Sequence, residues 1–346
     1  MLTALTITGF RGFPKLNVAG LSRINLFVGR NNAGKTSLLE AVEILAAGGH
    51  PSVLFRSPRR RAEQLLRESA AADRNALDLD LRHLFNGRGL TAGARFRIES
   101  QNAAVRFAEC EIVPATELGD AGAMPLFPDS LESGPMQALR FTGSQAREGV
   151  VIALNSAGSV QLDALGRVAV PALPCRHVLY LGNEGVDAAQ LGAMWDGVVL
   201  TPSEEEVMSA LRIIEPDIER LAITGRDGSR ETGRSAGGGA FVSMKGQKDR
   251  IPLGSMGDGI RRLLVMSLHV SRAAGGVLLV DDFDTGLHHS VIEKLWVLLI
   301  TMARRLDVQV FATSHSSDCL RALGQLQASR PDLAREACVH RIERGM

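Results

Sequence analysis

Aromatic residues and paired cysteines are scarce in this sequence. Phenylalanine, tyrosine and tryptophan together make up 4% of the 346 residues, while hydrophobic residues as a class make up 45%, so aliphatic side chains must fill the core. The four cysteines have no C-x-x-C spacing, which argues against the common zinc and redox motifs and indicates reduced, mostly buried thiols. These cysteines are Cys110, Cys175, Cys319 and Cys338.

The sequence also lacks an excess of charge, a membrane span and a leader. Lysine and arginine number 39 against 38 for aspartate and glutamate, so a nucleic-acid contact must come from a local patch. The longest apolar run, Leu295–Ala303, is far too short to span a bilayer, and Met1–Leu5 lacks the features of a signal peptide. We therefore expect a cytoplasmic protein with no membrane partner.

What the sequence does contain is organised around the stretch from Gly29 to Thr36. It fits the G-x-x-x-x-G-K-[ST] phosphate loop at every required position, between a short apolar strand, Ile24–Val28, and a helix that runs to about Ala47. Backbone N–H groups and the helix N-terminus favour a bound polyphosphate. The residues predicted to bind ATP here are Gly29, Arg30, Asn31, Asn32, Ala33, Gly34, Lys35, Thr36 and Ser37.

Two residues of this loop have predicted roles in the chemistry. Lys35, one of only five lysines in the chain, is expected to reach the β- and γ-phosphates of ATP. The hydroxyl of Thr36 is expected to ligate Mg²⁺.

Further candidates follow two apolar strands in the last third of the chain. The run from Val277 ends in Asp281 and Asp282, where Asp281 is expected to bind Mg²⁺ and Asp282 to polarise the attacking water. Two adjacent carboxylates are costly without a metal, which favours this interpretation over a structural one. His315 follows the strand Val308–Ala312 and is a candidate to contact the γ-phosphate or the water, with a purely structural role as the alternative.

Other features of the chain have less specific interpretations. The neighbouring His288 and His289 have poor geometry for one metal and are interpreted as turn residues. The arginine-rich segments Arg56–Arg61 and Arg226–Arg234 are either solvated surface or phosphate contacts to nucleic acid. Residues 114–145, rich in Gly, Pro, Ser and acidic residues, predict a poorly structured insertion.

Strand and helix patterns suggest three segments. Residues 1–183 are predicted to form an N-terminal lobe with the phosphate loop and a β-rich insertion, including strand pairs at 95–100 with 104–113 and at 150–154 with 160–162. Residues 184–220 predict a short helical stub, and residues 221–346 a C-terminal lobe that contains the two carboxylates and His315. The overall pattern is that of an α/β protein.

The order of these motifs resembles an ABC-type ATPase head, and more narrowly the single-head ATPases of the OLD-like group. The resemblance rests on the phosphate loop, a Ser-x-Gly-Asp signature from Ser255, the Asp-Asp strand end, the turn Gly286–Ser290 and the stretch Ala312–Cys319. It covers about 1–47 and 202–323. Members of this group are relatives of RecF and SMC heads in bacterial DNA repair and antiphage defence.

The resemblance implies a bilobed P-loop ATPase head, with a mixed and antiparallel N-terminal sheet and a parallel sheet flanked by helices. It also implies that Ser255 and Gly257 of one copy close over the γ-phosphate held by a second copy, in a homodimer. Two departures matter: Asp282 replaces the usual Glu, and the sequence offers only Gln101 as a weak Q-loop glutamine. Both departures argue against rapid turnover.

These features predict an ATPase that uses ATP and Mg²⁺ and dimerises around the nucleotide. The leading hypothesis is the sensor or motor subunit of a DNA-repair or antiphage-defence system, working with a separate effector protein and with DNA as a further partner through the arginine-rich segments. Two alternatives stay open: a RecF-like recombination mediator, and a regulatory scaffold that binds ATP but hydrolyses it little.

Overall fold

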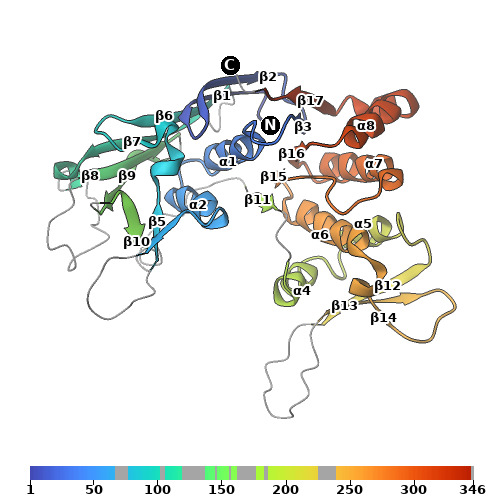
Figure 1. Ribbon diagram of the computed structural model, residues 1–346. Helices are drawn as coiled ribbons and strands as arrows, with labels where there is room; N and C mark the ends of the chain where they lie inside the picture. Colours follow the sequence, from blue (N-terminus) through green and yellow to red (C-terminus); the bar gives the residue numbers. More distant parts are fainter. Residues whose placement is uncertain are drawn as a thin grey trace, which may run out of the picture. The chain divides into compact units, whose positions relative to one another are not determined.

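The computed structural model describes residues 1–66, 77–101, 106–118, 137–144, 146–155, 157–161, 177–182, 186–224 and 239–343 (Figure 1). The chain divides into two compact units, each assembled from two stretches. The first unit contains Met1–Leu21 and Thr36–Arg176, and the second contains Ser22–Lys35 and His177–Met346. The strand before the phosphate loop thus belongs to the second unit, whereas the sequence interpretation grouped it with the N-terminal lobe.

The first unit is built on antiparallel sheets. One sheet has the strand order β2-β1-β6-β7-β8-β9, and a smaller one has the order β10-β5-β4. Alternate residues of β1, such as Leu5 and Ile7, are buried, as expected for a strand with one face on a core. The strands are β1 (Ala4–Phe10), β2 (Phe13–Ala19), β4 (Gln64–Leu66), β5 (Leu77–Asp80), β6 (Arg95–Ser100), β7 (Phe107–Pro114), β8 (Gln137–Gly143), β9 (Ala146–Leu154) and β10 (Ser159–Gln161).

The helices of this unit are few and mostly short. The longest of the described ones, α1, runs directly from the phosphate loop, and α2 follows a tight 3-10 turn rich in buried apolar residues. They are α1 (Lys35–Ala46), η1 (Pro51–Phe55), α2 (Arg56–Arg60), η2 (Arg82–Leu84), η3 (Asn86–Arg88) and η4 (Ala115–Leu118).

Two sequence predictions in this unit are wrong. Residues 137–143, expected in a poorly structured insertion, form β8, because Ala138, Leu139 and Phe141 are buried between β7 and β9. The expected pairing of the strands on either side of Asn155 also fails, because β9 pairs with β8 and β10 pairs with β5. Pro114 ends β7 and Ala115–Leu118 form η4, whereas residues 119–136 and 145 of the predicted insertion lie outside the described residues.

The second unit contains the parallel sheet that the sequence predicted. Its strand order is β11-β15-β16-β3-β17, and every neighbouring pair runs parallel. All residues of β15 and β16 are buried, as expected for central strands with both faces covered. The strands are β3 (Ile24–Val28), β11 (Val178–Leu181), β15 (Val277–Val280), β16 (Gln309–Ser314) and β17 (Ala337–Arg341).

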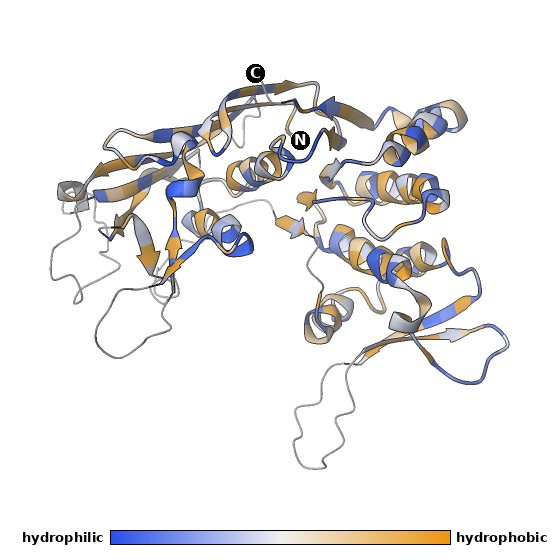
Figure 2. Ribbon diagram, viewed as in Figure 1, coloured by the Kyte–Doolittle hydropathy of each residue, from blue (hydrophilic) through white to orange (hydrophobic). Residues whose placement is uncertain are grey.

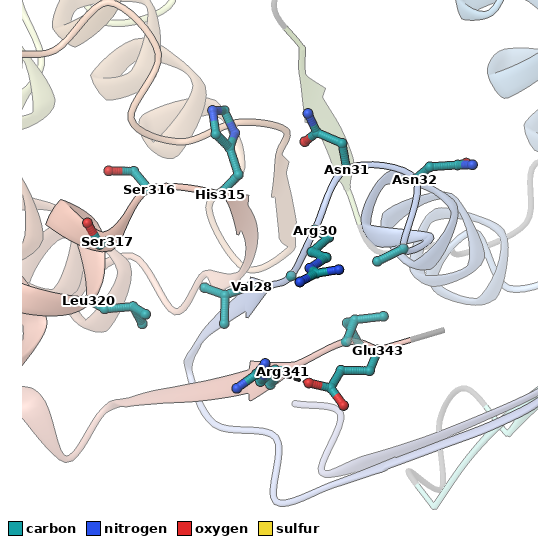
Figure 3. Close-up of a pocket in the computed structure, with 13 residues that line it drawn as sticks. Val28, Arg30, Asn31, Asn32, His315, Ser316, Ser317, Leu320, Arg341 and Glu343 are labelled. Carbon is teal, nitrogen blue, oxygen red and sulfur yellow. Dashed lines mark ion pairs between the residues drawn. The ribbon is translucent and has the colours of Figure 1, made fainter. Parts of the chain in front are cut away.

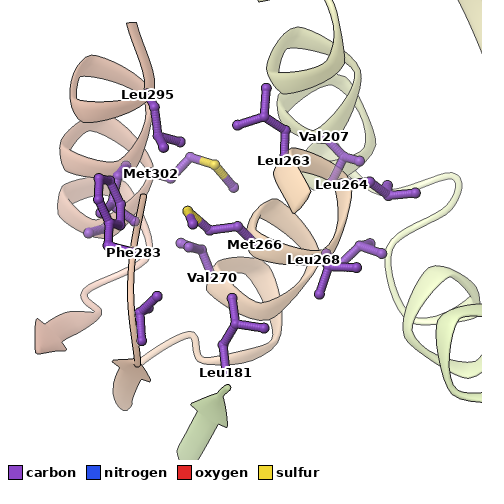
Figure 4. Close-up of a cluster of buried hydrophobic side chains, with 14 of the residues drawn as sticks. Leu181, Val207, Leu263, Leu264, Met266, Leu268, Val270, Phe283, Leu295 and Met302 are labelled. Carbon is purple, nitrogen blue, oxygen red and sulfur yellow. The ribbon is translucent and has the colours of Figure 1, made fainter. Parts of the chain in front are cut away.

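Helices and a small antiparallel sheet complete this unit. In Figure 4, Leu263 and Met266 of α6 lie with Leu295 and Met302 of α7 and with Phe283 in one buried cluster. Figure 2 shows that α6 and α7 carry both hydrophobic and hydrophilic residues, as amphipathic helices do. The other elements are α4 (Ala188–Asp196), α5 (Pro202–Leu211), β12 (Ile218–Thr224), β13 (Gly239–Met244), β14 (Ile251–Pro252), η5 (Leu253–Met256), α6 (Asp258–Arg272), α7 (His289–Arg305), α8 (Ser317–Ser329) and α9 (Pro331–Ala334).

The topology confirms the predicted fold class, an α/β protein with antiparallel strands and a parallel sheet flanked by helices. The strands at 95–100 and 107–114 pair antiparallel, as expected. The expected strand pair on either side of residues 225–238 also forms, as β12 with β13. The fold thereby presents the carboxyl ends of β15, β16 and β3 beside one another.

Candidate active site

Three segments singled out from the sequence follow three adjacent strands of the parallel sheet. Asp281 follows β15, His315 follows β16 and Gly29 follows β3. The register pairs Val280 with Ala312, so Thr313 and Ser314 of β16 extend past the end of β15. Polar groups at the carboxyl ends of parallel strands are where open α/β sheets bind their ligands.

Hydrogen bonds from two neighbouring strands hold the carboxylate of Asp281. The Thr313 hydroxyl donates to Oδ1 at 2.6 Å, and the Tyr180 hydroxyl, at the end of β11, donates to Oδ2 at 3.0 Å. Because both oxygens accept bonds, the carboxylate is fixed in orientation, as is usual for metal ligands. Neither partner was picked out from the sequence, although Tyr180 is the only tyrosine of the chain.

Asp282 has an unusual backbone conformation. Its φ is 49°, in the left-handed region that residues other than glycine seldom adopt unless their surroundings hold them there. The amide of Asp282 donates to the Thr313 hydroxyl at 2.9 Å, and the amide of Phe283 donates to the Thr313 carbonyl at 2.8 Å. The His315 Nδ1 lies 3.5 Å from Asp282 Oδ1, so the imidazole and the carboxylate are close enough to act on one water molecule.

Asp284 extends the same pattern. The Ser314 hydroxyl donates to its Oδ1 at 2.7 Å. Thr313 and Ser314 at the end of β16 and His315 directly after it therefore each contact one carboxylate of the turn that follows β15. We call Asp281–Asp284 the carboxylate turn.

The side chain of Lys35 forms hydrogen bonds with backbone carbonyls of its own phosphate loop. The Lys35 ammonium group donates to the carbonyls of Gly29 and Arg30 at 2.9 and 3.1 Å, and the lysine is 8% exposed. At Gly29 a Cβ would collide with the Ile342 carbonyl, so glycine is required there. Asn32 and Gly34 have φ values of 60° and 99°, conformations that turn the loop back on itself.

A cavity of about 910 Å³ lies beside this loop within the second unit. Figure 3 shows Arg30, Asn31 and Asn32 of the loop on one side of it, and His315 and Ser316 at the end of β16 on another. The loop and the candidate histidine thus line one space, which is within the size range of small-molecule sites.

The predicted signature residues lie at the start of α6. Ser255 is exposed, and its hydroxyl donates to the Pro252 carbonyl at 2.7 Å. Gly257 has a φ of 96°, and a Cβ there would meet no atom within 4 Å. The backbone at this helix start is therefore open to approach from outside.

The donor set suits a hard cation such as Mg²⁺. A fixed carboxylate after a strand is a typical protein ligand of Mg²⁺, which otherwise keeps waters and substrate phosphates. Among the described residues, no cluster of three or more His, Cys, Asp and Glu side chains has the arrangement of a protein-only metal site. The metal roles of Thr36 and Asp281 stay predictions, as do the nucleotide contacts of Ser37.

The first arginine-rich segment is largely paired with carboxylates of α1. Arg60 and Arg56 contact Glu43, with Arg56 at 3.6 Å, and Arg61 lies 2.7 Å from Glu40. The side chains of Glu40 and Glu43 are only 1% and 3% exposed. A phosphate backbone would have to compete with these buried carboxylates, which weighs against the nucleic-acid interpretation of this segment.

Of three further features that the sequence singled out, the structure describes two. Arg226–Arg234 lies outside the described residues. Gln101 is exposed, at the end of β6. His288, interpreted as a turn residue, is the N-cap of α7 and accepts a bond from the Ser290 amide.

Comparisons with known proteins agree with an ATPase. Residues 1–85 match a family described as AAA ATPase domain, and residues 213–320 match one described as AAA domain, putative AbiEii toxin, Type IV TA system. Both matched families are described as AAA domains, and together with the relative named next they confirm the predicted ATPase activity. A protein named ATP/GTP phosphatase from Helicobacter pylori (strain ATCC 700392 / 26695) is 23% identical over 349 residues, with 94% of this chain and 88% of the relative covered.

Two solved structures are similar to this chain. They are a crystal structure of the SmcHead bound to the C-winged helix domain of ScpA, with a TM-score of 0.42 at 12% identity, and the SMC head domain from Thermotoga maritima, with a TM-score of 0.40 at 13% identity. Each comparison covers 93% of this chain and 91% of the other. None of the described helices has the length and apolar character that crossing a membrane requires.

Proposed function

We propose that this ATPase hydrolyses ATP at the phosphate loop with the carboxylate turn, and that two copies close around the nucleotide. The observation that carries the hydrolytic part is the set of contacts from Thr313, Ser314 and His315 to Asp281, Asp284 and Asp282. These contacts come from the end of β16, which lies between β15 and β3, the strand that precedes the phosphate loop. Hydrolysis of a phosphoanhydride depends mainly on such positioning and on charge compensation.

The proposed roles follow from the chemistry of each group. Water attacks the γ-phosphorus, the bond to the bridging oxygen breaks, and ADP leaves. Asp282 accepts a hydrogen bond from the attacking water, with His315 beside it, and Lys35 exchanges its two loop carbonyls for phosphate oxygens. Asp281 and Thr36 would hold Mg²⁺, which when bound neutralises charge on the phosphates.

The proposed dimer rests on the start of α6. Ser255 is exposed, and the Cβ side of both Gly254 and Gly257 is open, so a phosphate group of another copy has access to this backbone. A site completed by a second copy in this way requires two chains related by a two-fold axis. This arrangement agrees with the assignment to the OLD-like group that we propose.

We further propose that the dimer is the sensor or motor subunit of a bacterial defence or DNA-repair system in the cytoplasm, acting on a separate effector. The description of the matched family as a putative toxin of a Type IV TA system supports a setting in which ATP turnover is coupled to a harmful effector. The side chain of Asp282 is shorter than that of the usual glutamate, which supports slow ATP turnover. Slow turnover suits a regulatory subunit that bound ATP holds in one state.

Mixing two inactive variants tests the shared site. Lys35→Ala removes the loop cation of one copy, and Ser255→Arg blocks the start of α6. Each variant should be inactive alone, whereas a heterodimer has one site with both defects and one with neither. We expect mixing to restore hydrolysis, to about half the wild-type rate per heterodimer if the two sites act independently.

Light scattering supplies the second half of this test. An Asp282→Asn variant, which should bind ATP and turn it over slowly, is expected to shift from monomer to dimer when ATP and Mg²⁺ are added. Failure to restore hydrolysis, together with a monomer in saturating ATP, would contradict the shared site and the roles of Ser255 and Gly257.

A further inference from the structure

One side chain links helix α6 to the carboxylate turn within the same chain. Arg262 lies in the second turn of α6, and its Nη2 donates to the carbonyls of Asp281 and Asp282 at 3.2 and 3.3 Å. Its Nη1 donates to the Gly182 carbonyl at 2.8 Å, just after β11. A single guanidinium group therefore bridges the ends of two strands from a helix that belongs to neither.

The placement of this guanidinium is costly. Burial lowers the pKa of Arg262, and the charges of Asp282, Asp281 and Asp284 act in the opposite direction. The arginine keeps its charge, because a guanidinium stays protonated in proteins. Its Nε is buried and has no hydrogen-bond partner among the described residues. An apolar side chain at this position would avoid both the burial of a charge and the unpaired Nε. The hydrogen bonds made by Nη1 and Nη2 therefore best explain why an arginine occupies this position.

The contact with Asp282 matters because the backbone of Asp282 is strained. Its φ of 49° persists only because neighbouring groups hold both sides of the residue. Thr313 holds the amide of Asp282, and Arg262 donates to its carbonyl. The first of these groups belongs to the sheet, and the second belongs to α6, the helix whose N-cap is Gly257.

We propose that Arg262 is a positioning residue that couples the start of α6 to the orientation of the Asp282 carboxylate. Arg262 is five residues from Gly257, or about 7.5 Å along a rigid helix, so movement at the helix start is transmitted to the guanidinium. In a dimer, ligand contact at the α6 start of one copy then adjusts the carboxylate turn of that same copy. This inference rests on the proposed function, because it requires that Asp282 act in hydrolysis.

Steady-state ATP hydrolysis by Arg262→Met tests the coupling against a matched control. The control is Arg261→Met, at the preceding position of α6, where the arginine side chain is exposed and its Nη2 donates to the Val186 carbonyl at 2.8 Å. We expect Arg262→Met to lower kcat by about 100-fold with little change in KM, because the turn is misplaced after ATP has bound. Arg261→Met should keep the wild-type values.

Arg262→Lys separates positioning from charge. Lysine keeps the positive charge but lacks the fork that reaches Gly182 and the two aspartate carbonyls together. We expect kcat between those of the wild type and Arg262→Met. Arg262→Lys also tests the coupling if Arg262→Met does not fold, because the lysine leaves a cation near the carboxylates of Asp281, Asp282 and Asp284.

A spectroscopic readout follows the turn directly. The ring of Phe283, inside the carboxylate turn, stacks on Trp296 with centroids 4.3 Å apart, and the chain has only two tryptophans. In a Trp195→Phe background, Trp296 is the one that remains. ATP should change its emission in this background, and Arg262→Met should reduce the change by half or more while Arg261→Met preserves it.

The outcomes separate the inference from the function on which it rests. A wild type that hydrolyses ATP, with Arg262→Met and Arg262→Lys equal to Arg261→Met in kcat and in the Trp296 response, overturns the coupling alone. A folded wild type whose hydrolysis is unaffected by Lys35→Ala and Asp282→Asn overturns the proposed function, and the coupling with it.

Discussion

The Thr313 hydroxyl lies 2.6 Å from Asp281 Oδ1 and also accepts a hydrogen bond from the amide of Asp282, at 2.9 Å. One hydroxyl group at the end of β16 thus orients the proposed metal ligand and fixes the backbone of the proposed catalytic carboxylate. It can do so because β16 extends past the last paired residue of β15, Val280. If Asp281 and Asp282 have the proposed roles, loss of this hydroxyl should affect both metal affinity and turnover.

Thr313→Val should therefore raise the Mg²⁺ concentration that ATP hydrolysis requires. Loss of a group that orients a metal ligand typically costs about 10- to 100-fold in metal affinity, so half-maximal activity should require more Mg²⁺ by that factor. Thr301→Val is the matched control, since Thr301 is exposed on α7 and bonds only within its helix, to the Val297 carbonyl. An unchanged Mg²⁺ requirement in Thr313→Val would show that Thr313 does not orient the metal ligand.

Asp282→Glu should hydrolyse ATP at least as fast as the wild type. Aspartate is one methylene shorter than glutamate, so its carboxylate sits about 1 Å from the position that glutamate would reach, and such a misplacement can cost about 10²-fold. Single-turnover rates at saturating ATP measure the effect without interference from product release. A fast wild type combined with an inactive Asp282→Glu would mean that another group positions the water.

Arg60→Ala should destabilise the first unit, whereas Arg59→Ala should not. Arg60 pairs with Glu43, whose side chain is 3% exposed, and removal of one partner of a buried pair costs about 3 kcal/mol. Arg56, at 3.6 Å from Glu43, offsets part of that loss. Arg59 is exposed, and surface substitutions of this kind change stability by about 0.5 kcal/mol or less. Urea unfolding of both variants measures the difference.

The same pair of variants addresses nucleic-acid binding. If the segment serves only to hold α1, any affinity for duplex DNA should be the same in Arg59→Ala as in the wild type at every salt concentration. A weaker affinity and a smaller salt slope in Arg59→Ala would instead assign the exposed part of this segment to phosphate contact.

Acid should destabilise the wild type more than a His269→Gln variant. Burial lowers the pKa of His269, with Arg272 and Arg262 acting in the same direction and the Val265 carbonyl against them. The unfolded chain then binds a proton more readily than the folded protein, so stability is greatest above the unfolded pKa of about 6.5 and falls as the pH drops below it. Thermal unfolding at pH 7 and pH 5.5 should show a smaller loss in the variant. Equal losses would indicate that other groups dominate.

Sequence patterns predicted the parts of the site that depend on local order along the chain. The phosphate loop, the carboxylates after β15 and His315 after β16 each stand directly after a strand, and an apolar run that ends in polar residues is sufficient to suggest their position. The parallel sheet itself followed from the same runs, because both β15 and β16 are wholly buried.

The groups that orient those residues depend on register and could not be inferred in this way. Thr313 and Asp281 are 32 positions apart and Tyr180 and Asp281 are 101 apart, and they meet only because parallel strands align as they do. Arg262 on a helix has no pattern that indicates which carbonyls it reaches. The sequence pattern does not predict the strand β8, because the Gly, Pro and Ser residues that precede it indicate a poorly structured segment.

Hydrolysis of ATP by purified Lys35→Ala, measured beside Lys294→Ala, tests the central claim most directly. Lys35 supplies the ammonium group inside the phosphate loop, while Lys294 is exposed on α7 and serves as the matched loss of one lysine. We expect Lys35→Ala to lose at least about 100-fold in kcat/KM and Lys294→Ala to match the wild type. Wild-type turnover in a folded Lys35→Ala would contradict the assignment of ATP hydrolysis to this loop.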